Sequence, residues 1–306
     1  MRLVFAGTPA VAVPTLHALA ARHEIAAVIT RPDAPLGRKR VLTPSPVAAA
    51  AEALDLPVIK TARLDDDATA RITALEAELG VIVAYGGIVR EPLLSAPRHG
   101  WINLHFSLLP AWRGAAPVQR ALIAGDAELG VSVFQLVPAL DAGDVFAMQT
   151  VDIPTDATAD VALELLAEAG AGVTAEVVSG IADGTANATV QEGTVTLAPK
   201  LGFEDGALDW KQPVASVYAR YRGVTPEPGA HTTLDGARLK ILAAAPAAGA
   251  PALSPGELSG TKTAILIGCG DGALEVTRVQ PAGKGAMNAA DWWRGLRAEH
   301  TVRVGS

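Results

Sequence analysis

The chain has 306 residues, of which 50% are hydrophobic and 19% charged, and its formal net charge is −7. This length allows about two domains, and the composition excludes a disordered chain. The single cysteine, Cys269, excludes an internal disulfide and a cysteine-based zinc site, so we expect a cytoplasmic protein in a reducing compartment. No apolar run is long enough to span a membrane, and the first residues form a strand pattern rather than a signal peptide.

Short apolar segments alternate with helical patterns through the first 181 residues. We expect strands at 2–6, 25–29, 56–59, 81–84, 101–105, 131–137 and 145–153. We expect helices that begin near Pro9 and that cover 47–54, 66–79, 117–124 and 158–181. This alternation is typical of a parallel, doubly wound α/β sheet, so the predicted N-terminal fold is Rossmann-like.

The pattern changes near residue 185. Residues 190–206 show no clear hydrophobic period, and we expect them to form a linker. After the linker we expect one helix and several short strands, at 214–221, 230–234, 239–243, 263–267 and 274–279. Short strands separated by turn residues indicate a small β-barrel, which we describe as OB-like. The predicted organisation is therefore a catalytic domain at 1–189, a linker at 190–206 and a β-barrel domain at 207–306.

Several common functional motifs are missing from the sequence. The six histidines lack the spacing of metal ligands, so we expect no metal. There is no G-x-S-x-G elbow for a serine nucleophile. The glycine-rich run at 268–272 lies between two expected strands with no helix after it, which favours a hairpin turn over a nucleotide site.

Asn103 and His105 lie two residues apart on the strand expected at 101–105. Alternation places both side chains on one face of the sheet, about 6 to 7 Å apart. Polar side chains at the end of a buried strand are costly without partners, and ligands bind at the carboxyl ends of strands in open α/β sheets. The pair is therefore a candidate site. The alternative is that His105 is a hydrogen-bonded core histidine.

Asp141 lies in a Leu-Asp-Ala-Gly-Asp turn between two expected strands. A carboxylate that reached the imidazole would fix its orientation and favour its charged form. Acidic residues are also ordinary in turns, and the sequence alone does not place Asp141 beside His105.

These segments together resemble the N10-formyltetrahydrofolate-dependent formyltransferases. The resemblance rests on Asn103-x-His105, on Ser107-Leu-Leu-Pro110 and on the Asp141 turn. It extends in order along nearly the whole chain, through Phe5–Pro9, Arg31–Asp33, Pro44–Pro46, Val83–Gly86, Trp112–Pro117 and Gln280–Lys284. The additional segments are similar to the branch of the family that formylates methionyl-tRNA.

The resemblance implies a metal-free transfer of the formyl group of 10-formyltetrahydrofolate to the α-amine of methionine on initiator tRNA. Asn103 and His105 would donate hydrogen bonds to the tetrahedral oxyanion. Asp141 would orient His105 and help to move the proton of the amine. The residues implied to bind folate are Ser107, Leu108, Leu109 and Pro110, together with main-chain groups of Tyr85 and Gly86.

Phe106 departs from the family pattern, because many relatives have glycine at this position. Strand alternation predicts that its side chain points away from Asn103 and His105. We therefore expect Phe106 to leave the chemistry unaffected.

The net charge is unevenly distributed along the chain. Residues 207–306 hold 11 Lys and Arg against 8 Asp and Glu, whereas the rest of the chain holds 14 against 24. The resemblance assigns the basic cluster Arg38-Lys39-Arg40 to the tRNA acceptor stem, and Lys284 is a second candidate phosphate contact. The Gly, Pro and charge content of the basic loop favours disorder without RNA. The implied partners are initiator methionyl-tRNA and folate, and we expect a monomer.

Three other functions stay open. A formyltransferase acting on a small amine would share the site but would need neither the basic loop nor the second domain. A 10-formyltetrahydrofolate hydrolase would use water as the acceptor. A non-catalytic RNA-binding protein would not need the Asn, His and Asp set, and the acidic larger domain disfavours it.

Overall fold

The computed structural model describes residues 1–37, 39–296 and 301–305. Contacts divide the chain into two compact units. The first unit comprises Met1–Pro117, Glu128–Asp152 and Leu163–Ala198. The second comprises Val118–Ala127, Ile153–Ala162 and Pro199–Ser306. Each unit has its own sheet and is described separately.

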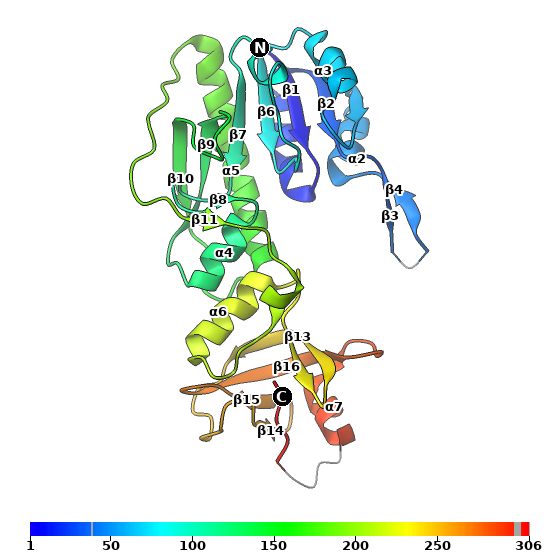
Figure 1. The fold of residues 1–306 in the computed structure, drawn as a ribbon, viewed down its shortest axis with the longest axis vertical. Helices are drawn as coiled ribbons and strands as arrows, with labels where there is room; N and C mark the ends of the chain where they lie inside the picture. The colour runs from blue at the N-terminus through cyan, green and yellow to red at the C-terminus, as the bar shows by residue number, and fades with distance from the viewer. Residues whose placement is uncertain (38, 297–300, 306) are drawn as a thin grey trace. The chain divides into compact units, whose positions relative to one another are not determined.

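The first unit is built on a seven-stranded sheet with the order β10-β9-β7-β6-β1-β2-β5 (Figure 1). Its strands are β1 (Arg2–Gly7), β2 (Glu24–Thr30), β5 (Val58–Lys60), β6 (Leu79–Val83), β7 (Trp101–His105), β9 (Leu129–Gln135) and β10 (Val145–Val151). The five strands β7, β6, β1, β2 and β5 are parallel to one another. The Rossmann-like fold predicted from the alternation of strands and helices is confirmed.

The two strands at one edge differ from the expectation of a wholly parallel sheet. β9 runs antiparallel to β7, and β10 runs antiparallel to β9. The chain between β7 and β9 carries α4 (Pro117–Ala124), most of which belongs to the second unit. α4 is therefore not a crossover helix that returns the chain to the opposite edge of the first sheet. As a result, β9 begins near the carboxyl end of β7 and runs antiparallel to it.

Helices pack on both faces of this sheet. They are η1 (Ala10–Ala12), α1 (Val13–Ala20), α2 (Pro46–Ala53), α3 (Asp66–Thr73), η2 (Leu93–Ser95) and α5 (Ala159–Asp183). Ile72 of α3 shares a core cluster with Trp101 of β7. Gly170 of α5 lies against Leu104, whose side chain is on the opposite face of β7. The strand β7 is therefore buried on both sides.

Local sequence explains where two of these helices begin. The Ser45 hydroxyl accepts a hydrogen bond of 3.0 Å from the Ala48 N–H, and the Asp65 carboxylate accepts one of 3.0 Å from the Ala68 N–H. Both are N-caps, which satisfy a helix-end donor. The helix expected at 66–79 instead ends at Thr73, and Glu76 has a φ of 51°, which no helix continues through.

The basic segment after β2 forms a hairpin. β3 (Ala34–Leu36) and β4 (Val41–Thr43) pair antiparallel, and they pair only with each other among the described residues. The large apolar side chains of this hairpin, Leu36, Val41 and Leu42, are 60–68% exposed. The disorder expected for the basic loop without RNA stays a prediction.

Residues 190–206, expected to be a linker, contain regular structure. β11 (Leu197–Ala198) pairs in parallel with β8 (Arg113–Gly114). The first unit ends at Ala198, and η3 (Phe203–Gly206) belongs to the second. We call residues 191–198 the strap, because side chains and backbone of this segment bind the loop at 112–114.

The second unit contains a six-stranded antiparallel sheet, as expected for a small β domain. Its strands are β12 (His231–Leu234), β13 (Ala237–Pro246), β14 (Leu258–Gly260), β15 (Ile265–Gly268), β16 (Ala273–Pro281) and β17 (Met287–Asn288), and its later helices are α6 (Val214–Val224) and α7 (Ala289–Leu296). The pairing follows β12-β13-β16-β15-β14, with β17 beside β16. In the described part of the chain this path does not return from β14 to β12, so the sheet is curled and open. α6 and α7 cover its apolar face, where Trp210, Ile241 and Val279 are buried.

Within residues 1–37, 39–296 and 301–305, none of the helices combines the length and the apolar character that a membrane crossing requires.

Candidate active site

Strand β7 brings Asn103 and His105 to one face of the sheet, as predicted from their spacing. Leu104 between them is 2% exposed on the other face. β7 lies between β6 and β9, so its backbone is paired on both sides and its end is fixed. His105 is the last residue of the strand and is 6% exposed. The geometry of the site therefore starts from a buried imidazole at the carboxyl end of a central strand.

Both nitrogens of the His105 ring face protein groups. Nε2 lies 2.9 Å from the carbonyl oxygen of Trp112. A carbonyl oxygen only accepts hydrogen bonds, so Nε2 carries the proton and donates. Nδ1 lies 4.0 Å from Oδ2 of Asp141. In the neutral ring, Nδ1 is therefore the nitrogen with a free lone pair.

The environment of the ring favours its neutral form. Burial lowers the pKa of His105 below its ordinary value of 6.5. The Asp141 carboxylate and the Trp112 carbonyl act in the opposite direction and raise this pKa. Neutral His105 can therefore accept a proton, and the Asp141 carboxylate stabilises the charged ring that results.

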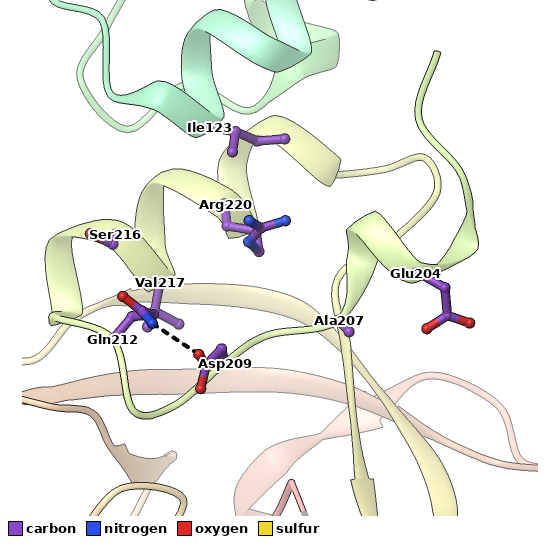
Figure 2. Close-up of a pocket in the computed structure, with 8 residues that line it drawn as sticks. All are labelled: Ile123, Glu204, Ala207, Asp209, Gln212, Ser216, Val217 and Arg220. Carbon is purple, nitrogen blue, oxygen red and sulfur yellow. Dashed lines mark hydrogen bonds between the residues drawn. The ribbon is translucent and has the colours of Figure 1, made fainter. Parts of the chain in front are cut away.

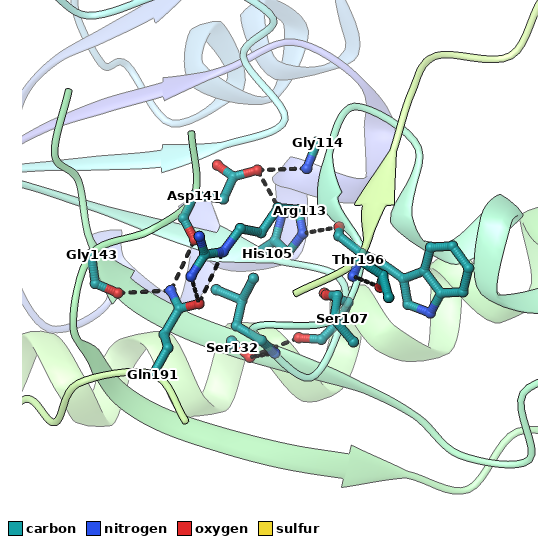
Figure 3. Close-up of polar contacts among 12 residues, drawn as sticks. His105, Ser107, Arg113, Gly114, Ser132, Asp141, Gly143, Gln191 and Thr196 are labelled. Atoms are coloured by element: carbon teal, nitrogen blue, oxygen red, sulfur yellow. Dashed lines mark hydrogen bonds and ion pairs between the residues drawn. The ribbon is translucent and has the colours of Figure 1, made fainter. Parts of the chain in front are cut away.

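Asp141 lies on the turn at residues 141–143, which we call the Asp141 turn. Its Oδ2 accepts a hydrogen bond of 2.8 Å from the Gly114 N–H (Figure 3). Its φ is 44°, in the left-handed region that costs free energy for a residue other than glycine. Asp141 thus reaches the neighbourhood of His105 through a backbone conformation that other contacts must hold.

Asn103 lies between two cavities. Its side-chain oxygen is buried and has no hydrogen-bond partner among the described residues. A cavity of about 560 Å³, the first cavity, has apolar walls that include Ile88, Leu94 and Leu136. A cavity of about 420 Å³, the second cavity, contains His105. Both are lined by Ile82, Gly87, Asn103, Leu140 and Asp141.

Only some of the residues implied to bind folate line the two cavities. Tyr85 and Gly86 line the second cavity. Residues 107–110 line neither cavity, and hydrogen bonds hold them in a compact loop. The Ser107 hydroxyl donates to the Ala111 carbonyl at 2.6 Å, and the buried Ser132 hydroxyl donates to the Ser107 carbonyl at 2.7 Å. Their direct contact with folate stays a prediction.

Phe106 is 7% exposed and lines the second cavity together with His105 and with Leu104. The expected direction of its side chain stays a prediction. The strand ends at His105, so the period of two no longer determines where the next side chain points.

No motif or pattern in residues 191–198 predicted that the strap contributes to the site. The Thr196 hydroxyl accepts a hydrogen bond of 2.8 Å from the Trp112 N–H, and the Gln191 amide binds both Arg113 and the Asp141 turn (Figure 3). The segment has no hydrophobic period, and its side-chain contacts are to residues 48 or more positions earlier. Gln191 lies between Val190 and Glu192, and neither neighbour marks it as part of a site.

The predicted tRNA-binding residues that the structure describes are all exposed. Lys39 and Arg40 are exposed on the turn of the β3–β4 hairpin, and Arg38 lies outside the described residues. Lys284 is exposed in the second unit, on the turn between β16 and β17, where its carbonyl accepts a 3.1 Å hydrogen bond from the Gln280 side chain. None of the described three lines either cavity.

The second unit has a cavity of its own, of about 390 Å³, beside α6 (Figure 2). Its polar groups are bound within the unit: Gln212 donates to the Asp209 carboxylate at 3.0 Å, and Arg220 donates to the Asp205 carbonyl at 3.1 Å. No predicted site residue lines it. In the described ranges of the chain, no three His, Cys, Asp or Glu side chains are grouped as a metal ion would require.

Asn103 and Asp141 line both cavities, and His105 lines the second. Polar side chains shared by two cavities at the strand ends of a doubly wound sheet are typical of an enzyme that brings two substrates together. The Formyl transferase family profile matches residues 1–178, and the profile of the Formyl transferase C-terminal domain matches residues 200–297. The chain belongs to the formyltransferase family and is an enzyme. The resemblance found in the sequence motifs is confirmed.

Relatives of known structure or name cover nearly the whole chain. The methionyl-tRNA formyltransferase of Leifsonia xyli subsp. xyli is 62% identical over 98% of this chain and 99% of its own length. The N-formyltransferase from Helicobacter canadensis, solved with folinic acid and dTDP-3-aminofucose, has a TM-score of 0.69 at 16% identity, over 91% of this chain and 98% of that chain. Methionyl-tRNA formyltransferase from Clostridium thermocellum has a TM-score of 0.57 at 14% identity, over 82% and 95%. These two structures share the fold.

Gly143 of the Asp141 turn offers a direct test of this geometry. A Cβ added there would lie 1.8 Å from the Gln135 carbonyl oxygen, so Gly143→Ala must displace the turn. We expect the turnover number for formyl transfer to fall about 100-fold, as a displacement of about 1 Å can cause.

The matched control is Gly172→Ala in α5, where an added Cβ meets no atom within 4 Å. This variant should keep full activity and gain about 0.5–1 kcal/mol in unfolding free energy. Steady-state kinetics and urea unfolding of both variants would measure this, and full activity in Gly143→Ala would contradict the importance of the turn.

Proposed function

We propose that the protein transfers the formyl group of 10-formyltetrahydrofolate to the α-amino group of methionyl-initiator-tRNA, for translation initiation. The observation that carries the proposal is that Asn103 and Asp141 line both cavities, with His105 beside them in the second. Two substrates bound in these cavities would meet at the three side chains. The methionyl-tRNA formyltransferase that is 62% identical over nearly its full length supports the choice of acceptor.

The first cavity is the proposed site of the folate. Its apolar walls and the backbone of residues 87–91 suit a flat heterocycle with polar edges. The Helicobacter canadensis enzyme of the same fold was solved with folinic acid, which supports a folate co-substrate. Tyr85 and Gly86 lead into this backbone segment, and residues 107–110 would support the site through the loop that they form.

The second cavity is the proposed site of the aminoacyl end of the tRNA. The amine nitrogen would attack the formyl carbon, and the carbonyl oxygen would become an oxyanion. Asn103, whose side chain lines both cavities, would donate a hydrogen bond from its amide nitrogen to this oxygen. The tetrahedral intermediate would then break its bond to N10 of the folate, which leaves with a proton.

His105 is the proposed carrier of that proton. Nε2 is committed to the Trp112 carbonyl, so Nδ1 would accept the proton lost by the attacking amine and return it to N10. The Asp141 carboxylate, 4.0 Å from Nδ1, would stabilise the imidazolium formed between these steps. This role differs from direct oxyanion binding by neutral His105, because Nδ1 donates only when the ring is protonated.

We propose the second unit and the basic hairpin as the tRNA-binding parts, and the first unit as the catalytic domain. The positive balance of residues 207–306 supports this division, since the rest of the chain is strongly acidic. Lys39, Arg40 and Lys284 would contact phosphates, with Arg38 as a further candidate. All residues of the proposed site come from one chain, so a monomer suffices, and the proposed location is the cytoplasm, where initiator tRNA is used.

The choice of acceptor is tested with three parallel reactions. The protein is incubated with 10-formyltetrahydrofolate and with methionyl-initiator-tRNA, a small amine such as an amino sugar nucleotide, or water alone. Formylated methionyl-tRNA as the main product supports the proposal. Rapid formylation of the small amine, or release of formate at the same rate without an acceptor, would refute it.

Asn103→Ala should lower kcat for formyl transfer by about 100- to 1,000-fold, the usual effect of removing one oxyanion donor. The control is Asn187→Ala, because Asn187 is exposed and, within the described part of the chain, its side chain donates to the Thr185 carbonyl alone. Asn187→Ala should be as active as the unaltered protein. Equal activity of both variants would remove Asn103 from the mechanism.

Asp141→Asn should lower turnover and also shift its pH dependence. Asp141 raises the pKa of His105, so its neutralisation lowers that pKa further below 6.5. Since neutral His105 is the proton acceptor, the acid-side loss of kcat/KM should move to lower pH. The control is Asp144→Asn, an exposed carboxylate beside the same turn, and a shift of the profile to higher pH in Asp141→Asn would contradict the assignment.

Lys39→Ala combined with Arg40→Ala should raise KM for tRNA and leave KM for folate unchanged. Each lost phosphate contact should reduce the slope of log KM against log salt concentration by about 1. Arg98→Ala, an exposed cation of the same unit, serves as the control. An unchanged salt slope in the double variant would argue against phosphate binding by the hairpin.

A further inference from the structure

We propose that Gln191 is a positioning residue of the active site, which sets the distance between Asp141 and His105. The inference rests on the proposed roles of these two residues. Gln191 lies in the strap, outside the lining of both cavities, so it would act on the reaction only through the groups that it binds.

Every hydrogen-bonding position of the Gln191 amide is used. Its Nε2 donates to the carbonyls of Asp141 and Gly143, each at 2.8 Å. Its Oε1 accepts from Arg113, at 3.2 Å from Nε and 2.6 Å from Nη2. An amide has two donor hydrogens and two acceptor lone pairs, so the group is fully bound. The partners also fix its orientation, because carbonyls only accept and a guanidinium only donates.

The four hydrogen bonds join the two loops that surround His105 (Figure 3). The loop at 112–114 supplies the Trp112 carbonyl to Nε2 and the Gly114 N–H to the Asp141 carboxylate. The Asp141 turn supplies the carboxylate itself. Gln191 thus connects the loop that carries the Asp141 carboxylate to the loop whose Trp112 carbonyl binds the imidazole.

The backbone of both loops needs such a tie. Asp141 has a φ of 44° and Trp112 a φ of 61°, so both lie in the left-handed region without being glycine. Each such residue costs of order 1 kcal/mol or more and persists only where its surroundings hold it. The two N–H donors of Gln191 bind the carbonyls at the first and last residues of the Asp141 turn. Without them, the turn is free to relax and to carry the carboxylate away from His105.

Gln191→Leu removes all four hydrogen bonds at nearly constant volume. We expect kcat to fall about 10- to 100-fold, as loss of alignment by about 1 Å can cause, with KM for folate and tRNA within about threefold of normal. Gln191→Glu keeps an acceptor for Arg113 but loses both N–H donors. Its kcat should fall as in Gln191→Leu, because it is the Asp141 turn that must be held.

The matched control is Gln149→Leu, which alters an exposed glutamine on β10. Activity is measured with whichever acceptor the unaltered protein formylates. If that acceptor is not methionyl-tRNA, the proposed function is overturned, but the kcat of the Gln191 variants can still be compared with that of the control. Unchanged kcat in Gln191→Leu, or full kcat in Gln191→Glu, would overturn the positioning role.

A readout independent of turnover separates positioning from general destabilisation. Urea unfolding first identifies a temperature at which each variant is folded. The pKa of His105 is then measured by NMR at that temperature. Asp141 is the charged group that raises this pKa, and the Trp112 carbonyl is the other group that does so. Gln191→Leu should lower the pKa of His105, whereas Gln149→Leu should not. A lower kcat with an unchanged pKa of His105 would show that Gln191 only stabilises the fold.

Discussion

The buried imidazole of His105 is the constraint on which the rest of the site depends. A histidine ring has two nitrogens, and burial makes an unpartnered one costly. His105 is the last residue of β7, and both groups that face its ring nitrogens come from loops. One loop must turn so that a carbonyl faces Nε2, and another must bring a carboxylate toward Nδ1. The left-handed residues Trp112 and Asp141 are what this arrangement requires.

The same constraint explains the chemistry that the site supports. Because the Trp112 carbonyl fixes the proton on Nε2, the ring presents one defined nitrogen to a substrate. Because burial keeps the ring neutral, that nitrogen is an acceptor, and the carboxylate beside it limits the cost of accepting a proton. A site with these properties can move one proton between two nitrogen atoms. Formyl transfer between two amines needs such a movement.

The sequence predicted the features that depend on local periodicity. The strand at 101–105 and the shared face of Asn103 and His105 follow from a period of two that is repeated at each residue. The direction of β9 was not predictable in this way, because it depends on whether the preceding helix packs on the first sheet. Alternation holds only within a strand, so it does not determine the direction of Phe106, which follows the last residue of β7. The contacts of Gln191 could not be predicted, since hydrogen bonds to residues 48 or more positions away leave no pattern in the local sequence.

The β3–β4 hairpin also has a consequence for the free protein. Its two strands pair only with each other in the described chain, so each keeps an unpaired outer edge, and Leu36, Val41 and Leu42 are exposed beside it. Such an edge is a template for pairing with a second copy. Lys39 and Arg40 stand at the turn between the strands, and like charges on two copies repel when their hairpins approach. The cations of this hairpin would therefore oppose self-association of the protein through these strand edges.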